Sequence, residues 1–514
     1  MSFNFSKSKF VSACAHCNKY AWLDKYKPSE KAPVSEFTQS LFDNGHRVGE
    51  LAKEYFKADV DVTAIDDDGR LNLSDMLLLT EKHIKLGTKA IAEASFNHNG
   101  LFCSVDILAR KDDGSYDIFE VKSSKREKIT KKNPTGVKEK YLLDASYQRY
   151  VLENCGINVN RVYVVMLNPD YIRGKALELN EYFVKCDVTA ETLARQGVVA
   201  DKLKELAPVI SNPIEPETVI CDRCNKCDYF AYCGKDIPTP SPFDIYNMDF
   251  PVKRKFYEAG ASFFDVLKLE PDLNEAAKLQ IEYYNRPEDT YIDMASINNF
   301  LDNLLFPLYS LDFETYQAIV PEFEGLKASV QIPFQYSLHI MKKPDGDYSE
   351  GVADIEEKGF LDISGGDPRR AIAESLVENI PYGACVVAYN CSTERSIVKR
   401  LAEEFDDLAD HLLSFVYRDP LDIFRKGYYY NKRMGGSFSL KSVAPAMYPD
   451  DPKMDYHNLE GSVKNGTQAM NSIARVKELS DEEKEKLRID LEKYCALDTY
   501  AVVKILKKLY EVCK

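Results

Sequence analysis

A proline- and serine-rich run, IPTPSPF (237–243), divides the sequence into two stretches that each mix helix and strand patterns. Residues of these types interrupt regular secondary structure and often mark a domain boundary. A mainly helical pattern follows the run, and a second α/β pattern begins at PLYSLDFET (307–315). At 514 residues the chain is long enough for several hydrophobic cores. We therefore expect a multidomain α/β protein, with domains at 1–237 and 301–514 and a helical connector at 238–300.

The chain carries a net charge of −15, from 67 Lys and Arg against 82 Asp and Glu. This excess of acid excludes a polybasic protein that binds nucleic acid by bulk charge, although a local basic track stays compatible with it. The opening sequence, MSFNFSKSKFVSACAHC, lacks the apolar core of a signal peptide, and no run approaches the ~18 apolar residues that span a bilayer. Its 13 cysteines are too few for a disulfide scaffold, so we expect a cytoplasmic protein without a membrane partner.

Two predicted strands, LFCSVDILAR (101–110) and YDIFEVKS (116–123), are separated by the turn sequence KDDGS. Asp106 lies in the first strand, and Glu120 and Lys122 share one face of the second because they are two residues apart. A hairpin brings the two carboxylates together, where a divalent cation relieves their repulsion and polarises a phosphodiester. The competing interpretation is a surface hairpin in which E-V-K forms an ordinary ion pair.

The surroundings of this hairpin add further candidates. The spacing of apolar residues predicts a helix over 74–95, with Glu93 near its end as a third oxygen ligand, and a second helix over 144–156 that contains Gln148 as a polar contact. Directly after the second strand the chain reads SSKREKITKK, a basic run that beside a nuclease strand would form a phosphate track. The candidate phosphate-binding residues are Lys125, Arg126, Lys128, Lys131 and Lys132.

The order of these parts resembles the core of the PD-(D/E)XK nucleases, and in particular their RecB-like branch, which includes CRISPR-associated RecB-like exonucleases. The resemblance implies a restriction-endonuclease-like fold that hydrolyses phosphodiester bonds. It further implies that Glu93, Asp106 and Glu120 hold Mg²⁺ or Mn²⁺. Lys122 would assist by neutralising charge that develops on the phosphate.

The stretch CDRCNKCDYFAYC places four thiols close together in sequence, at Cys221, Cys224, Cys227 and Cys233. Such spacing favours a soft metal centre, and one interpretation is a zinc knuckle made by these four cysteines. The last three, preceded by Cys17 near the N-terminus, resemble the ligands of the iron–sulfur RecB-like nucleases, which implies a 4Fe-4S cluster with a structural role. Cys14 and Cys221 are additional thiols that leave the choice of ligands open.

The second α/β stretch contains three acidic motifs in order. The first is D-x-E at the end of an apolar strand, the second is N-x3-E where a strand runs into a helix, and the third is Y-x3-D on the last helix. Two-metal phosphodiester cleavage needs several converging carboxylates and a group that positions water. The candidates are Asp312, Glu314, Glu394, Tyr494 and Asp498, with Asp422 as a secondary candidate.

This order resembles the RNase H-like DEDD 3′–5′ exonucleases of the type that has a tyrosine in the third motif. In that family the second motif normally ends in Asp, so Glu394 departs from the pattern. The competing interpretation is an RNase H-like fold whose acidic residues no longer bind metal. The full arrangement resembles a family of bacterial proteins of poorly defined function that join an iron–sulfur RecB-like nuclease to a predicted DEDD-type exonuclease through a helical connector.

The resemblance implies a metal-dependent nuclease with two sites, acting on single-stranded or end-bearing DNA in repair, recombination or defence. A second interpretation has one active site, with the other domain as a clamp on DNA or RNA. A third is a metal-stapled adaptor without enzymatic activity in a larger nucleic-acid complex. The sequence contains no P-loop, so unwinding would require a helicase or another protein partner.

Overall fold

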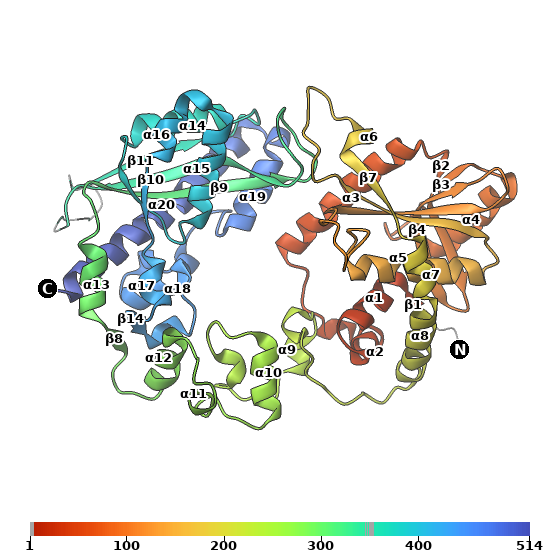
Figure 1. The fold of residues 1–514 in the computed structure, drawn as a ribbon, viewed down its shortest axis with the longest axis horizontal. Coiled ribbons are helices and arrows are strands. Elements are labelled where there is room, and N and C mark those ends of the chain that lie inside the picture. Colours follow the sequence, from red (N-terminus) through yellow and green to blue (C-terminus); the bar gives the residue numbers. More distant parts are fainter. Residues whose placement is uncertain (1–4, 345, 347, 349–353) are drawn as a thin grey trace. The chain divides into compact units, whose positions relative to one another are not determined.

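The structure is a computed structural model, and it describes residues 5–344, 346, 348 and 354–514. The chain is a mixed α/β multidomain protein with several sheets, and it divides into two compact units (Figure 1). The first unit comprises Met1–Ile237 and Ile319–Val330, and the second comprises Pro238–Ala318 and Gln331–Lys514. The helical residues after the proline-rich run therefore group with the second unit.

The first unit is built on a seven-stranded sheet. Six of its strands follow the order β2-β3-β4-β5-β6-β7, and the seventh, β1, pairs in parallel with β4. The three strands β3, β4 and β5 are antiparallel, and β5 and β6 are parallel. Residues along β4 alternate between the buried core and a more accessible face, as the period of two in a strand requires. The strands are β1 Phe5–Ser6, β2 Val60–Asp61, β3 Ala90–His98, β4 Leu101–Arg110, β5 Tyr116–Lys125, β6 Val159–Leu167 and β7 Phe183–Asp187.

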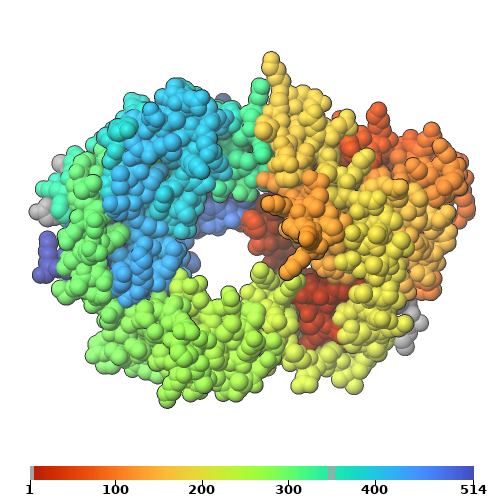
Figure 2. Space-filling model, in the orientation of Figure 1, coloured from red at the N-terminus to blue at the C-terminus, as the bar shows by residue number. Residues whose placement is uncertain are grey.

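Helices of the first unit pack on this sheet and on each other. Figure 2 shows the red N-terminal residues against the yellow residues that precede the cysteine-rich segment, which matches the contact between α2 and α8. Trp22 on α2 is 3% exposed and donates from Nε1 to the carbonyl of Asn212. The helices are α1 Lys7–Ala15, α2 Asn18–Tyr26, α3 Glu36–Phe56, α4 Leu73–Leu86, α5 Glu139–Asn154, α6 Leu179–Tyr182, α7 Thr189–Ala194, α8 Gln196–Ser211 and α9 Phe230–Cys233.

The helix predicted over 74–95 is wrong in its second half. It ends at Leu86, because Gly87 adopts a left-handed conformation with φ +73° and its N–H donates to the carbonyls of His83 and Ile84. This is the usual glycine cap of a helix C-terminus. The alanine-rich residues that follow form β3, so Glu93 lies in a strand and not in the helix.

The segment Ile319–Val330 completes the core of the first unit, although it follows β9 in the sequence. The hydroxyl of Tyr182 donates to the carbonyl of Ile319 at 3.0 Å, and Arg173 and Leu326 pair through their backbones at 2.9 Å. Ile319 and Ala328 are buried in one apolar cluster with Tyr182. The first unit is thus assembled from two separate stretches of chain.

A five-stranded sheet with the order β11-β10-β9-β12-β13 forms the centre of the second unit. Strand β9 pairs in parallel with β12, which pairs in parallel with β13, and β10 pairs antiparallel with β11. A separate antiparallel pair joins β8 and β14. The strands are β8 Thr290–Ile292, β9 Leu308–Ala318, β10 Val330–Met341, β11 Ile355–Leu361, β12 Cys385–Val387, β13 Val416–Arg418 and β14 Tyr429–Asn431.

The last helix of the second unit, α20, has 32 residues and begins at a capping box in which Ser480 and Glu483 exchange hydrogen bonds. Within the described ranges, none of the helices has the length and apolar character needed to cross a bilayer. The helices of this unit are α10 Phe250–Glu258, α11 Val266–Leu269, α12 Glu275–Tyr283, α13 Met294–Leu301, α14 Arg369–Asn379, α15 Ser392–Glu404, α16 Asp406–Leu413, α17 Leu421–Arg425, α18 Leu440–Met447, α19 Gly466–Ala474 and α20 Asp481–Val512.

Candidate active sites and cysteine cluster

The first carboxylate site lies on β3, β4 and β5 of the first unit. The antiparallel pairing of Ile107 with Phe119 puts Asp106 opposite Glu120, and the backbone N–H of Val121 donates to Oδ2 of Asp106 at 2.6 Å. The two carboxylates of the predicted hairpin are therefore neighbours. Because Glu120 is only 1% exposed, its charge must be balanced inside the protein.

Two lysines balance the charge of Glu120. The ammonium of Lys7, at the start of α1, lies 2.8 and 3.1 Å from the two carboxylate oxygens, and Lys122 Nζ lies 2.5 Å from Oε1. Lys122 also donates to Asp144 on α5 at 2.6 Å. Gln148 Nε2 donates to Glu120 at 2.6 Å and to Asp144 at 3.2 Å. Neither Lys7 nor Asp144 was predicted from the sequence.

The electrostatics of this site follow from burial and from these ion pairs. Burial, together with the charges of Asp106 and Asp144, raises the pKa of Glu120 to about 7. Burial also raises the pKa of Glu93, which Lys7 partly offsets. For Asp144 the neighbouring Lys122 and Lys7 outweigh burial and hold its pKa far below the usual range. Carboxyls thus outnumber the ammonium groups that contact them, and a divalent cation would relieve the repulsion among them.

The predicted phosphate track begins at the end of β5 and continues into an irregular segment. Lys128, Lys131 and Lys132 are exposed, whereas Lys125 and Arg126 are half-buried. Burial lowers the pKa of Lys125, and the nearby Lys327 adds to the effect. The run is therefore accessible to an anion along its outer part.

The cysteines of the two ends of the first unit meet in three dimensions. Cys17 caps α2, and together with Cys227 and Cys233 it packs on a buried aromatic cluster that includes Tyr20 and Tyr229. Burial raises the pKa of the Cys227 thiol to about 11, with contributions from Cys17 and Cys233. The thiols from the N-terminal and the cysteine-rich segment are thus mutual neighbours.

The two additional thiols differ from each other in their surroundings. The sulfur of Cys221 lies 2.9 Å from that of Cys224, whose pKa is raised by burial and by this contact. Burial raises the pKa of Cys14 to about 11, and its charged neighbours are Lys202 and Glu205 of α8. All 13 cysteines are free thiols. Cys221 therefore adjoins the predicted ligand set, whereas Cys14 lies among charged residues of α8.

The second carboxylate site lies in the second unit, where β9 and α20 supply its central residues. Asp312 and Glu314 come from β9, and Tyr494 and Asp498, four residues apart, come from one face of α20. Strand β12 pairs with β9 and leads into α15, which begins just before Glu394. The sheet and the last helix therefore bring the three predicted motifs to one place.

The four carboxyls lie close enough to influence one another electrostatically. Burial raises the pKa of Asp312 well above its usual value, and the charges of Asp498, Glu314 and Glu394 raise it further. The same causes act on its neighbours: burial and Asp498 raise the pKa of Glu314 to about 8, and burial raises that of Asp498 to about 6. Lys441 lowers the pKa values of Glu314 and Asp498 in part, but among the described residues no lysine or arginine forms an ion pair with these carboxyls.

Glu394 carries a buried carboxylate oxygen that lacks a hydrogen-bond partner among the described residues. The residue is 4% exposed, and burial followed by the charge of Asp419 raises its pKa to about 7. Its Oε2 atom is buried without a hydrogen-bond partner among the described residues. A buried carboxylate oxygen without a partner costs free energy that a bound cation would recover. The donor set of this site therefore fits a divalent metal ion.

Several residues of the second site were missed from the sequence. The hydroxyl of Tyr456 donates to Asp498 Oδ1 at 2.5 Å, and Lys441 Nζ lies 3.3 Å from the hydroxyl of Tyr494. Lys441 also lies 5.1 and 5.0 Å from the ring centroids of these two tyrosines. Both tyrosines keep their protons, because burial followed by the charge of Asp498 raises their pKa values far above the usual range. No spacing rule pointed to Tyr456 or Lys441.

The structure does not group the secondary candidate Asp422 with these carboxyls: it is partly exposed and forms an ion pair with Lys426 at 2.8 Å, one helical turn away. Asp419 lies closer to Glu394, whose pKa it raises, and accepts hydrogen bonds from the backbone N–H groups of Asn390 and Cys391 at 2.9 and 3.1 Å. It fixes the turn that leads into α15, where Asn390 has a left-handed φ of +63°.

Comparisons with known proteins find a family model and a solved structure among the similarities. A family model described as "Domain of unknown function (DUF2779)" matches residues 309–439, which include Asp312, Glu314 and Glu394. A solved structure titled "Crystal structure of SSO0001" is 13% identical, covers 46% of this chain and 89% of its own, and has a TM-score of 0.20. No curated protein matches the chain.

Proposed function

We propose that this chain is a metal-dependent nuclease that hydrolyses the phosphodiester bonds of DNA at two sites. The observation that carries the proposal is the second carboxylate site, in which Asp312, Glu314 and Asp498 are crowded together with raised pKa values. Among the described residues no ammonium or guanidinium forms an ion pair with them. Divalent cations stabilise such a set of carboxylates, and phosphodiester hydrolysis uses cations held in this way.

In the second site the residues that would hold Mg²⁺ or Mn²⁺ are Asp312, Glu314, Glu394 and Asp498. When bound, the cations would supply a nucleophilic water and polarise the scissile phosphate. Tyr494 retains its hydroxyl proton and can orient the attacking water by a hydrogen bond. Lys441, 3.3 Å from that hydroxyl, can stabilise negative charge that develops on the phosphate. The order of motifs supports a 3′–5′ exonuclease of the DEDD type on an RNase H-like fold.

In the first site Glu93, Asp106 and Glu120 would hold the cation, on a fold of the PD-(D/E)XK, RecB-like type. Lys122 bridges Glu120 and Asp144 and is held protonated by them, so its ammonium can assist by neutralising charge on the phosphate. The exposed lysines that follow β5 supply contacts to the DNA backbone. Single-stranded or end-bearing DNA is the substrate that this assignment favours, in a cytoplasmic protein that acts in repair, recombination or defence.

For the cysteines we propose a 4Fe-4S cluster on Cys17, Cys224, Cys227 and Cys233, which would hold the N-terminal segment against the cysteine-rich segment. Purified protein should then be brown and contain about four iron atoms per chain. Cys227→Ser should bleach the protein, whereas Cys155→Ser, at an exposed position outside the cluster, should leave its colour unchanged. A colourless protein with one zinc per chain would instead assign a zinc knuckle to this segment.

A second candidate function has only the DEDD-type site active, with the first unit as a clamp on DNA or RNA. Lys7 favours this alternative, because its ammonium contacts both carboxylate oxygens of Glu120, the atoms with which that residue would hold a cation. A chain with neither site active would be an adaptor in a nucleic-acid complex. Any unwinding of duplex would come from a helicase partner.

The test is a cleavage assay on labelled single- and double-stranded DNA and RNA, with Mg²⁺, Mn²⁺ or EDTA. Glu120→Gln and Asp312→Asn remove one site each while preserving side-chain size. Matched controls are Glu81→Gln, at an exposed position, and Asp422→Asn, at a partly exposed one, since each of these acids pairs with a lysine one turn away. We expect each active-site variant to remove one activity and the double variant to remove both.

A 5′ end label on the DNA distinguishes 3′–5′ exonuclease activity from other cleavage. Loss of 3′-to-5′ shortening of a 5′-labelled strand in Asp312→Asn, with other cleavage retained, would assign the exonuclease to the second site. If only Asp312→Asn matters, the clamp interpretation of the first unit holds. If both variants degrade DNA at the rate of the controls, the chain is not a nuclease that uses these residues.

A further inference from the structure

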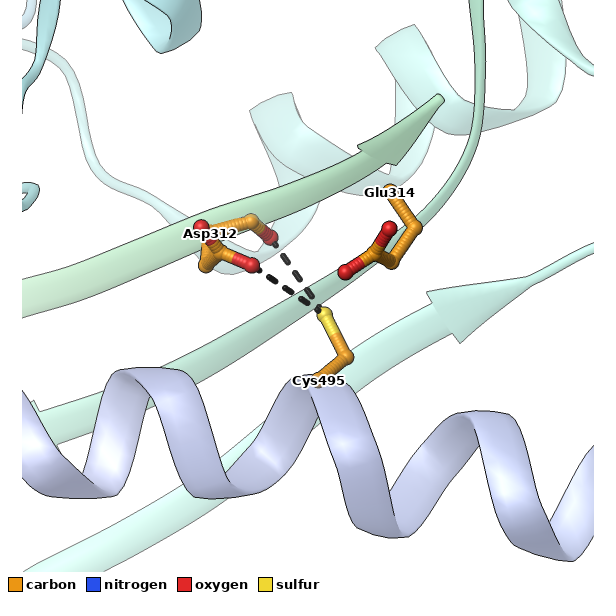
Figure 3. Close-up of side chains that lie close together, drawn as sticks. All are labelled: Asp312, Glu314 and Cys495. Atoms are coloured by element: carbon orange, nitrogen blue, oxygen red, sulfur yellow. Dashed lines mark hydrogen bonds between the residues drawn. The ribbon is translucent and has the colours of Figure 1, made fainter. Parts of the chain in front are cut away.

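The second carboxylate site contains a thiol that no DEDD motif includes. Figure 3 shows the sulfur of Cys495, on α20, pointing toward Asp312 and Glu314 on β9. One potential ligand atom from each of these three residues lies within 4.8 Å of the others. Cys495 has no solvent exposure, so the thiol belongs to the interior of the site.

Helix geometry directs this thiol into the site. Cys495 follows Tyr494 directly and precedes Asp498 by three residues, so it shares the helical face of Asp498. Its sulfur lies 3.7 Å from both the carbonyl oxygen and Oδ2 of Asp312. These are long, weak hydrogen bonds, so the thiol has no strong partner of its own.

The environment of the sulfur is acidic. Asp312 and Glu314 each offer a carboxylate oxygen within 4.8 Å of it, and Asp498 lies one turn further along the same helix. Binding of a divalent ion would displace the thiol proton to solvent, form one metal–sulfur bond and change no oxidation state.

We propose that Cys495 is a third ligand of a cation held by Asp312 and Glu314, and that this ligand gives the site a preference for thiophilic divalent cations such as Zn²⁺, Co²⁺ or Cd²⁺ over Mg²⁺. Two oxygens and one sulfur form a borderline donor set, whereas Mg²⁺ selects oxygen ligands only. This inference rests on the proposed function for the role of the cation, but cation binding can be measured without nucleic acid.

The probe is ¹¹³Cd²⁺, added to the full chain with the cysteine cluster as purified. Cadmium bound by one sulfur and several oxygens has an NMR resonance well separated from that of cadmium bound by four thiolates, so the two sites of this protein are distinguishable. We expect one such mixed-ligand resonance, which disappears in Cys495→Ser and in Asp312→Asn and persists in Asp422→Asn.

Titrations of the protein with Cd²⁺ and with Mg²⁺ measure the preference of the site for thiophilic cations. Cys495→Ser should weaken Cd²⁺ binding at this site by at least about tenfold, the scale on which even an indirect metal contact changes affinity. Mg²⁺ affinity should stay within about threefold of the original, because Mg²⁺ does not use the sulfur. Cys495→Ala should repeat both results, and circular dichroism identifies a variant that fails to fold. If one variant fails to fold, the other decides the result.

The outcomes separate this inference from the proposed function. A wild-type protein without a mixed sulfur–oxygen resonance, or a resonance unchanged in both Cys495 variants, overturns the thiol ligand even if Asp312 is essential for DNA degradation. Conversely, a Cys495-dependent resonance in a protein whose Asp312→Asn variant degrades DNA normally upholds the cation site and removes its role in cleavage.

Discussion

The two carboxylate sites balance buried negative charge in different ways. In the first unit, Glu120 contacts two lysine ammonium groups directly. In the second unit, Asp312 and Glu314 form no ion pair among the described residues, and burial together with neighbouring carboxyls raises their pKa values. The pKa of Glu120 is raised as well, so both sites depend on pH, but only the first adds direct competition between a lysine and a bound metal ion.

The presence or absence of lysine ion pairs determines how each site would respond to a divalent cation. A cation that enters the first site must compete with Lys7 for the oxygens of Glu120, since that ammonium contacts both of them. A cation that enters the second site must displace protons, so its binding strengthens as pH rises. The following predictions test this contrast, from the largest expected effect to the smallest.

Glu120→Ala should destabilise the first unit by about 1–3 kcal/mol, because it removes a buried acceptor of hydrogen bonds from Lys7 and Lys122, although Asp144 still pairs with both lysines. Chemical unfolding followed by circular dichroism measures the loss. Glu120→Gln, which retains hydrogen-bonding oxygen and nitrogen atoms, should lose less. Equal stability of Glu120→Ala and the wild type would show that the lysines do not depend on this carboxylate.

The metal-free second unit should lose stability as pH rises from about 5 to 8. Between the usual carboxyl pKa of about 4 and the raised values, up to about 8 for Glu314, the folded state binds more protons than the unfolded state, so the free energy of unfolding falls with increasing pH. Each retained proton contributes at most about 1.4 kcal/mol per pH unit. Thermal unfolding in EDTA across this range measures the slope.

Asp312→Asn supplies the matched comparison for this pH dependence. It removes one of the crowded carboxyls, so the variant should be more stable than the wild type at pH 8 and should show a shallower slope. Asp422→Asn should retain the original slope, since Asp422 is partly exposed and pairs with Lys426 rather than with these carboxyls. A slope that is identical in all three proteins would mean that the carboxyls of the second site are ionised without metal.

Lys7→Met should increase the affinity of the first site for Mn²⁺ by about tenfold, because it removes one competing positive charge from Glu120. Binding of Mn²⁺ followed by electron paramagnetic resonance measures the change. Lys9→Met, two residues away and with no ion pair among the described residues, is the control. Weaker Mn²⁺ binding in Lys7→Met would identify the lysine as a group that supports the metal site.

Tyr456→Phe should have the smallest effect. It removes the hydroxyl that donates to Asp498, a hydrogen bond of about 1 kcal/mol, and so raises the pKa of Asp498 by less than about one unit. The pH at which exonuclease activity reaches half its maximum should rise accordingly. Tyr448→Phe removes a hydroxyl bonded to the carbonyl of Lys504 and should leave the profile unchanged. A shift in both variants would indicate a general structural effect.

The sequence predicted those parts of the sites that depend on local pattern. The spacing of two in a strand put Glu120 and Lys122 on one side, and the spacing of four in a helix paired Tyr494 with Asp498. Asp144 could have been found in the same way, because it precedes Gln148 by four residues. Glu93 was assigned to the wrong element, since an alanine-rich run fits both a helix and a strand until Gly87 ends the helix.

The remaining site residues depend on long-range packing. Lys7 contacts a residue 113 positions away, and no local periodicity encodes such a distance. Lys441 and Tyr456 reach the second site from segments without a motif. The sequence therefore indicated which side chains converge along each element, but not which residues from elsewhere in the chain balance their charge.

The assembly of the first unit from two separate chain segments affects how the protein folds during synthesis. Because Ile319–Val330 supplies part of its core, the ribosome must translate the chain past Val330 before this unit is complete. Until then Tyr182 lacks its acceptor, the carbonyl of Ile319, and apolar side chains of the cluster are exposed to solvent. A fragment that ends at Ile237 should reproduce this nascent state, with lower solubility and faster proteolysis than the full chain.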